Sequence, residues 1–84
     1  MFHRMTLSRP VLVSSSAVPL YEQVADHIAA EVAAGNLHPG DKLPGERELA
    51  REWGVAYGTV RAAIWLLRDR GVIISRHGKG TFIA

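Results

Sequence analysis

The chain has 84 residues, of which 48% are hydrophobic, so it can bury one small core and not two. It contains no cysteine, which excludes disulfide bonds and thiolate metal sites, and it has no run of about 18 apolar residues that would span a membrane. The net charge of +2 hides an asymmetry, because residues 20–41 carry four acidic and no basic residues whereas residues 57–84 carry five basic residues and one Asp. This pattern suits a polyanionic partner at the C-terminal end, or it simply keeps the surface soluble.

Residues 1–18 show no clear periodicity and are expected to form a leader, which is either flexible or includes Val11–Val13 as a short docking strand. The first helix is predicted to begin at Pro19, which fits a first helical turn, and to end at Gly35, which favours a left-handed cap. Its buried stripe repeats every fourth residue and consists of Leu20, Val24, Ile28 and Val32.

Two further helices are predicted over residues 46–53 and 57–70, with Gly54 in the turn between them and Gly71 at the end of the second. Two helices joined by such a short turn form a helix-turn-helix. Leu37 precedes them in a loop and should fill the core. The other buried positions are predicted to be Leu43, Leu49, Ala50, Trp53, Val60, Ala63, Ile64 and Leu67.

A β-hairpin is predicted to follow the last helix. Residues 72–75 have β-branched character, from Val72, Ile73 and Ile74, and read as a strand. Residues 77–80 contain two glycines that suit a tight turn, and residues 81–83 form the returning strand. A helix-turn-helix followed by a hairpin is a winged helix-turn-helix. We therefore predict a mainly α fold, with three helices and a two- or three-stranded antiparallel sheet, over residues 19–84.

Six motifs follow one another along the chain: Pro19-Leu20-Tyr21-Glu22-Gln23-Val24, Gly40-Asp41-Lys42-Leu43-Pro44, Glu46-Arg47-Glu48-Leu49-Ala50, Gly54-Val55, Thr59-Val60-Arg61 and His77-Gly78-Lys79-Gly80-Thr81-Phe82. Together they resemble the N-terminal DNA-binding domain of the GntR family of bacterial transcription regulators. The resemblance implies a cytoplasmic regulator of transcription, more often a repressor, that binds double-stranded DNA as a homodimer. Members usually continue past the wing, so we expect a domain cut from a longer regulator, and a small-molecule effector only if a further domain exists.

By resemblance, Arg47 and Arg61 are the strongest candidates for DNA contact, and the wing contributes His77, Gly78 and Lys79. For Arg47, an intrahelical ion pair with a neighbouring Glu is the alternative. The residue chemistry agrees for Arg61, which lies near the start of its helix and can donate two bonds to guanine or clamp a phosphate. Two residues before Arg61, the hydroxyl of Thr59 can donate to a phosphate.

The chain departs from the family pattern at four positions. The resemblance leads one to expect Ser in place of Gly45, Ser or Thr in place of Ala56, Arg in place of Tyr57, and Thr or Pro in place of Gly58. Tyr57 and Gly58 stay within the expected DNA site. The hydroxyl of Tyr57 is expected to bond a phosphate, or its ring to contact a thymine methyl group, in place of a base-reading Arg. The family's operator preference therefore does not transfer to this chain.

Trp65, Leu66 and Ile74 are apolar at positions where the family is usually polar or charged. They indicate a slightly larger core, or a surface covered by the leader or by a second copy of the chain. They also support the alternative function, in which Trp65 and Leu66 make the winged helix a protein-interaction or dimerisation module. No nucleophile–base pair, carboxylate pair or phosphate loop is evident, and the four histidines are scattered, so we expect neither an enzyme nor a metal or cofactor site.

Overall fold

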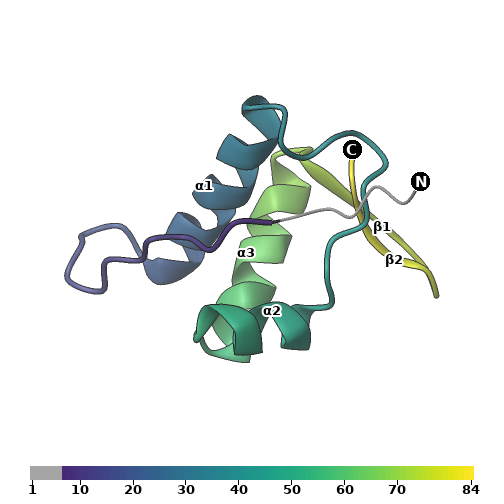
Figure 1. Ribbon diagram of the computed structural model, residues 1–84. Coiled ribbons are helices and arrows are strands. Elements are labelled where there is room, and N and C mark those ends of the chain that lie inside the picture. The colour runs from purple at the N-terminus through teal and green to yellow at the C-terminus, as the bar shows by residue number, and fades with distance from the viewer. Residues whose placement is uncertain (1–6) are drawn as a thin grey trace.

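The computed structural model describes residues 7–84, so residues 1–6 of the expected leader lie outside the described part. The elements follow the order α1 (Leu20–Ala33), α2 (Glu46–Trp53), α3 (Tyr57–Asp69), β1 (Ile73–Arg76) and β2 (Gly80–Ile83) (Figure 1). Helix α3 packs against both α1 and α2, and the hairpin projects from beyond its C-terminal end. The predicted winged helix-turn-helix, with three helices and a two-stranded sheet, is confirmed.

Glycines end the helices, as the sequence predicts. Gly35, Gly54 and Gly71 all adopt positive φ angles, of 79°, 64° and 74°. After α1, the amides of Asn36 and Leu37 both donate to the Glu31 carbonyl, which closes the helix. Helix α2 has the predicted bounds, whereas α3 ends one residue earlier than predicted. Because the left-handed region favours glycine, each of these positions fixes where the chain turns.

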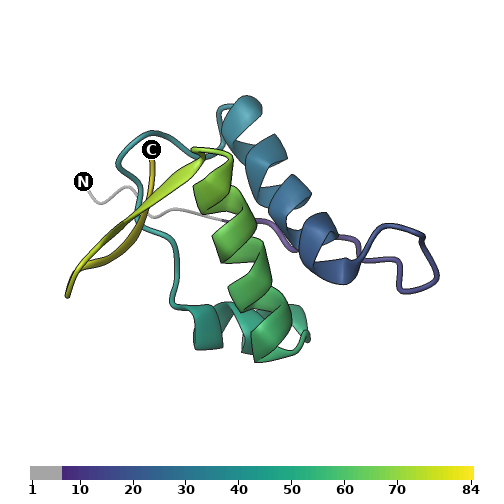
Figure 2. The same cartoon turned by 180° about the vertical axis from the view of Figure 1, so that it is seen from behind.

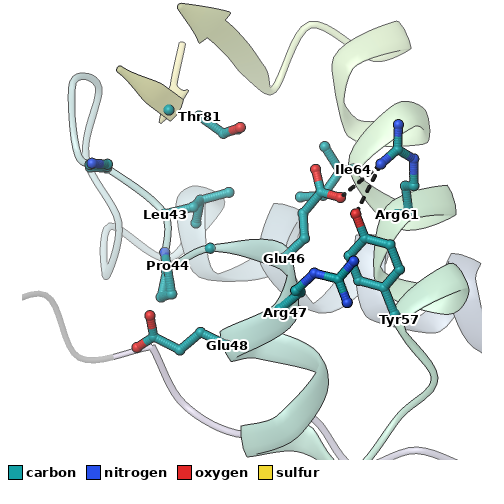
Figure 3. A pocket seen from close by; sticks show the side chains of 12 residues that line it. Leu43, Pro44, Glu46, Arg47, Glu48, Tyr57, Arg61, Ile64 and Thr81 are labelled. Carbon is teal, nitrogen blue, oxygen red and sulfur yellow. Dashed lines mark hydrogen bonds and ion pairs between the residues drawn. The ribbon is translucent and has the colours of Figure 1, made fainter. Parts of the chain in front are cut away.

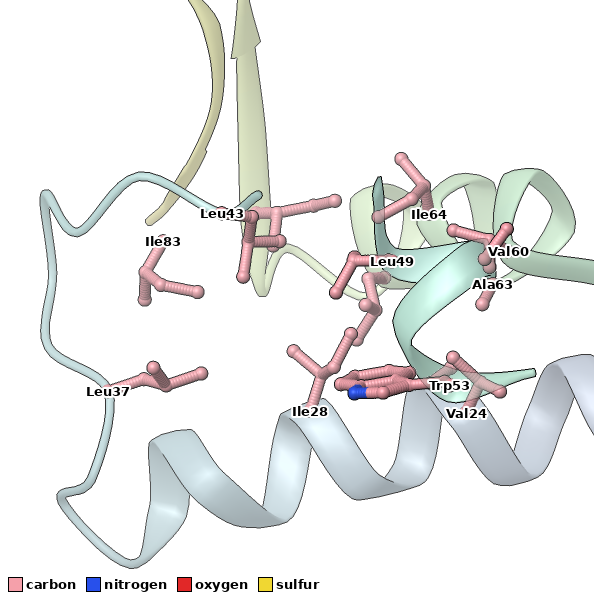
Figure 4. Packing of buried hydrophobic residues seen from close by; sticks show 14 residues of the cluster. Val24, Ile28, Leu37, Leu43, Leu49, Trp53, Val60, Ala63, Ile64 and Ile83 are labelled. Atoms are coloured by element: carbon pink, nitrogen blue, oxygen red, sulfur yellow. The ribbon is translucent and has the colours of Figure 1, made fainter. Parts of the chain in front are cut away.

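The core lies between the three helices and the inner face of the hairpin (Figure 4). Leu37, in the loop after α1, and Trp53, at the end of α2, are both buried, as predicted. Val32 and Leu66 are half-buried at the edge of this core. The fully or nearly buried set consists of Val24, Ala25, Ile28, Leu37, Leu43, Leu49, Ala50, Trp53, Val60, Ala63, Ile64, Leu67, Ile73 and Ile83.

The two strands pair antiparallel, with Ile73 opposite Ile83. Both strands differ slightly from the prediction. Strand β1 is shifted forward by one residue, because the Val72 amide still donates to the Leu67 carbonyl of α3 at 2.9 Å. Strand β2 begins one residue earlier than predicted, at Gly80. The segment before α2 runs beside β2, since the Leu43 amide donates to the Thr81 carbonyl and the Ile83 amide to the Asp41 carbonyl, each at 2.8 Å. These bonds fix the base of the wing to the entry of α2.

The described part of the leader lies along α1 and forms no strand. Gln23 holds it: its side chain accepts from the Val13 amide at 2.9 Å and donates to the carbonyls of Val13 and Val18 at 2.9 and 2.7 Å. Pro10 is buried and Leu12 packs against the core. From the sequence, residues 11–13 are either flexible or a short docking strand; this segment docks on α1 but forms no strand.

Residues 7–18 of the leader do not cover the apolar surface of Trp65, Leu66 and Ile74, although cover by the leader was one of the alternatives drawn from the sequence. Residues 7–18 bond to α1, whereas Trp65 on α3 and Ile74 on β1 remain 55% and 40% exposed. Leu66 alone follows the larger-core interpretation, because it is half-buried and packs against core residues. The apolar surface is thus smaller than the sequence suggested, and it consists mainly of Trp65.

Acid should weaken the attachment of the leader. Hydrogen bonds from Ser8 and Asn36 lower the pKa of Glu31 below its ordinary value of 4.5. A lowered pKa means that the ionised carboxylate stabilises the fold fully above pH 4.5, and that this contribution is lost as the pH falls through the lower, folded-state value. We expect the melting temperature of Ser8→Ala to fall less than that of the parent between pH 7 and roughly pH 3, and Glu22→Gln to behave like the parent. Equal acid profiles for the parent and Ser8→Ala would refute this role of Ser8.

Candidate DNA-binding surface

A hollow of about 540 Å³ opens between the start of α2, the first turns of α3 and the start of β2 (Figure 3). Three basic side chains, those of Lys42, Arg47 and Arg61, line it together with Tyr57 and Glu46. The helix-turn-helix brings the arginines together, because Arg47 lies on α2 and Arg61 on α3. A concave surface with several cations is suited to an anionic partner.

Arg61 is held in place by two neighbours. Its Nη1 donates to the Tyr57 hydroxyl oxygen at 2.9 Å and lies 3.9 Å from Glu46 Oε1. The hydrogen bond to Tyr57 is the main reason that the pKa of Arg61 is raised, with a further contribution from Glu46. The side chain is still 55% exposed, so a fully charged guanidinium faces solvent with donors to spare.

Arg47 stacks on the face of the same tyrosine. Its guanidinium carbon lies 4.3 Å from the centre of the Tyr57 ring, whereas that of Arg61 lies 6.0 Å from it. None of the ion pairs among residues 7–84 joins Arg47 to Glu48 or Glu52, so the intrahelical pair considered from the sequence does not form. Tyr57 thus contacts both arginines, one through its ring and one through its hydroxyl.

The other predicted residues lie outside the hollow. Gly58 and Thr59 lie in the first turn of α3, with Gly58 exposed and Thr59 half-buried. His77, Gly78 and Lys79 form the exposed tip of the wing, which is closed by a bond from the Lys79 amide to the Arg76 carbonyl at 2.9 Å. Figure 2 shows α3 in the foreground and the wing extending beside it. The structure therefore places the predicted residues in two groups, one made of Arg47 on α2 and the start of α3, and one at the wing tip.

Lys42 and Glu46 are part of this surface but were not predicted from the sequence. A Cβ atom on Gly80 would lie only 2.8 Å from Lys42 Cε, so the lack of a side chain at Gly80 lets Lys42 lie against the start of β2. Glu46 places a carboxylate beside Arg61, and its Oε1 is buried without a hydrogen bond. The one available signal was that both residues belong to the quoted motifs.

A second group of basic and aromatic side chains lies further along α3. The guanidinium of Arg68 lies 4.8 Å from the centre of a Trp65 ring and donates to the Ser75 hydroxyl of β1 at 2.5 Å. The Trp65 side chain is therefore ordered by Arg68, which also connects α3 to the wing. Such a cation–π contact at an exposed position is worth about 0.5–1 kcal/mol.

Two other features are absent from residues 7–84. No three His, Asp or Glu side chains in that range gather closely enough to bind a metal ion. The same range contains no helix of the length and apolar character that crossing a membrane requires.

Comparisons with known proteins agree on one family. The family model described as "Bacterial regulatory proteins, gntR family" matches residues 20–83. The mannosyl-D-glycerate transport/metabolism system repressor MngR of Escherichia coli is 45% identical over 65 residues, which is 77% of this chain and 27% of the relative. YtrA of Sulfolobus acidocaldarius, a GntR-family transcription factor, superposes with a TM-score of 0.84 at 39% identity, over 90% of this chain and 80% of that one. The DNA-binding domain of AraR, solved in complex with operator ORE1, superposes with a TM-score of 0.76 at 37% identity, over 93% of this chain and 95% of that one.

These matches confirm the resemblance drawn from the six motifs and extend it over both helices of the helix-turn-helix and the wing. The chain spans less than a third of the length of the curated relatives, for example 27% of MngR. The similarity therefore concerns this domain and not the rest of those proteins.

Proposed function

Because the chain belongs to the gntR family of bacterial regulatory proteins, we propose that it represses transcription by binding a specific operator in double-stranded DNA. The observation that supports this most strongly is the pair of arginines on α2 and α3, held around Tyr57 on an open and concave surface. Arg61 lies near the start of the second helix of the helix-turn-helix, a place well suited to reach the major groove, and Arg47 lies beside it on the first helix.

We assign two roles within the DNA-binding surface. Arg61 reads a base, since its free donors match the O6 and N7 atoms of guanine, and Arg47 and Lys42 contact phosphates. Thr59, beside the exposed Gly58, donates its hydroxyl to a phosphate of the DNA backbone. At the wing tip, residues 77–79 contact the neighbouring groove, where Lys79 supplies charge and Gly78 allows close approach.

The biological assembly that we propose is a cytoplasmic homodimer on DNA, in which each copy contacts one half-site. Half-sites about one helical turn apart would match this geometry. The relatives are named as regulators, which supports a role other than catalysis. A small-molecule effector would act through a further domain, as a partner of the whole regulator.

Salt dependence tests the electrostatic part of the proposal. Each phosphate that a cation neutralises contributes about −0.9 to the slope of log K against log salt, so the three cations Lys42, Arg47 and Lys79 should give a slope of roughly −2.7 per copy. Titration of a labelled duplex, chosen by selection from random DNA, measures it. Lys79→Ala should reduce the slope by about 1. A slope near zero, or failure to select any sequence, would refute the proposal.

A protein-interaction module that uses Trp65 and Leu66 is the weaker alternative. Leu66 is half-buried against the core, and Trp65 is stacked by Arg68, so the apolar area available to a partner is small. A chain that binds no duplex at low salt, but forms dimers through Trp65, would support that alternative.

A further inference from the structure

We propose that Tyr57 is a positioning residue that holds Arg61 and Arg47 in place before DNA arrives, and that it does not itself read the DNA. This inference rests on the proposed binding of duplex DNA by this surface. It assigns a task to a residue that stands where the family resemblance leads one to expect an Arg. The positive charge missing at residue 57 is thus offset by order imposed on two neighbouring arginines.

The hydroxyl group and the ring of Tyr57 make separate contacts. The hydroxyl oxygen accepts from Arg61 Nη1 at 2.9 Å, and the ring face supports the Arg47 guanidinium at 4.3 Å. The ring is half-buried and packs against the core, so it cannot swing freely. Figure 3 shows both guanidinium groups beside the tyrosine, one reaching it from α2 and one from α3.

Order in the free protein matters because arginine is long and flexible. Immobilising one such side chain on binding costs roughly 0.5–1.5 kcal/mol, and a side chain that is already held avoids part of this cost. Glu46 contributes to the same arrangement, since its carboxylate lies 3.9 Å from Arg61 Nη1 on the side away from solvent. Arg61 is therefore restrained by two groups while most of its donors stay available.

The two parts of Tyr57 predict two separable couplings. Tyr57→Phe removes the acceptor but keeps the ring, so it should weaken operator binding by roughly 2- to 10-fold and act only through Arg61. Tyr57→Leu removes both, so its loss should be larger and should depend on Arg47 as well. A tyrosine that donates directly to DNA would instead lose affinity whether or not the arginines are present.

A set of double-mutant cycles decides between these possibilities. Affinity for the selected duplex is measured for Tyr57→Phe and Tyr57→Leu, each alone and combined with Arg61→Ala or Arg47→Ala. We expect the Tyr57→Phe loss to vanish with Arg61→Ala and to persist with Arg47→Ala. Part of the Tyr57→Leu loss should vanish with Arg47→Ala. Tyr21→Phe, on exposed α1 surface, is the matched control and should change nothing.

A second measurement needs no DNA. In NMR spectra of the free protein, Tyr57→Phe should increase the mobility of the Arg61 guanidinium and leave that of Arg47 unchanged. An unchanged Arg61 signal, or a Tyr57→Phe loss that persists in the Arg61→Ala background, would overturn the positioning role while leaving DNA binding intact. If Arg61→Ala itself leaves operator affinity unchanged, the proposed role of Arg61 fails as well.

Discussion

Arg61→Ala is expected to weaken binding to the selected operator by about 1–3 kcal/mol, which is roughly 5- to 150-fold. The reason is geometric. Tyr57 and Glu46 restrain one end of the guanidinium, while the remaining donors face solvent from the early part of α3. A guanidinium held in this way can donate two parallel hydrogen bonds to guanine, and the alanine side chain can donate neither. The measurement is a titration of the selected duplex against a random duplex of equal length.

Affinities for the selected and the random duplex distinguish a base contact of Arg61 from a phosphate contact. Loss of base reading lowers affinity for the selected duplex far more than for random DNA, whereas loss of a phosphate contact lowers both equally. Arg70→Ala is the matched control: it also removes one positive charge at α3, but Arg70 bonds to Asp26 of α1 at 2.8 Å. An equal loss on both duplexes for Arg61→Ala would show that Arg61 only contacts phosphate.

Helix ends and core positions were predictable because each depends on short-range signals. Gly35, Gly54 and Gly71 end the three helices, and the buried residues repeat with helical spacing. The error at β1 comes from a backbone hydrogen bond at the end of the preceding helix. Strand β1 starts at Ile73 because the Val72 amide is still bound by the last turn of α3, which propensity alone does not reveal.

The candidate site was only partly predictable, for a related reason. Spacing places Tyr57 and Arg61 one helical turn apart, so their hydrogen bond was within reach of the sequence. Stacking of Arg47 on Tyr57 depends instead on how α2 crosses α3, and the path of Lys42 depends on Gly80 at the start of β2. The attachment of the leader through Gln23 uses backbone groups of an aperiodic segment, which leave no pattern in the sequence.

The largest loss of stability is expected for Leu67→Ala. Leu67 is fully buried on α3, between the other helices and the hairpin, so its truncation leaves a cavity and should cost about 2–5 kcal/mol. The total stability of a domain is only about 5–15 kcal/mol, and one this small should be near the lower end. Since about 1 kcal/mol corresponds to roughly 4–8 °C in a domain of this size, the melting temperature should fall by at least about 8 °C. Thermal unfolding followed by circular dichroism measures it.

Trp65→Ala gives the informative contrast, because the same experiment then tests the surface that the leader leaves open. Trp65 is 55% exposed, and its described partner is Arg68, so in a monomer its truncation should cost no more than about 1 kcal/mol. If instead it lowers stability as much as Leu67→Ala does, and the parent's melting temperature rises with protein concentration, a second copy must bury Trp65. A small loss that does not vary with concentration would leave Trp65 as an exposed side chain beside the DNA-binding surface, ordered by Arg68 alone.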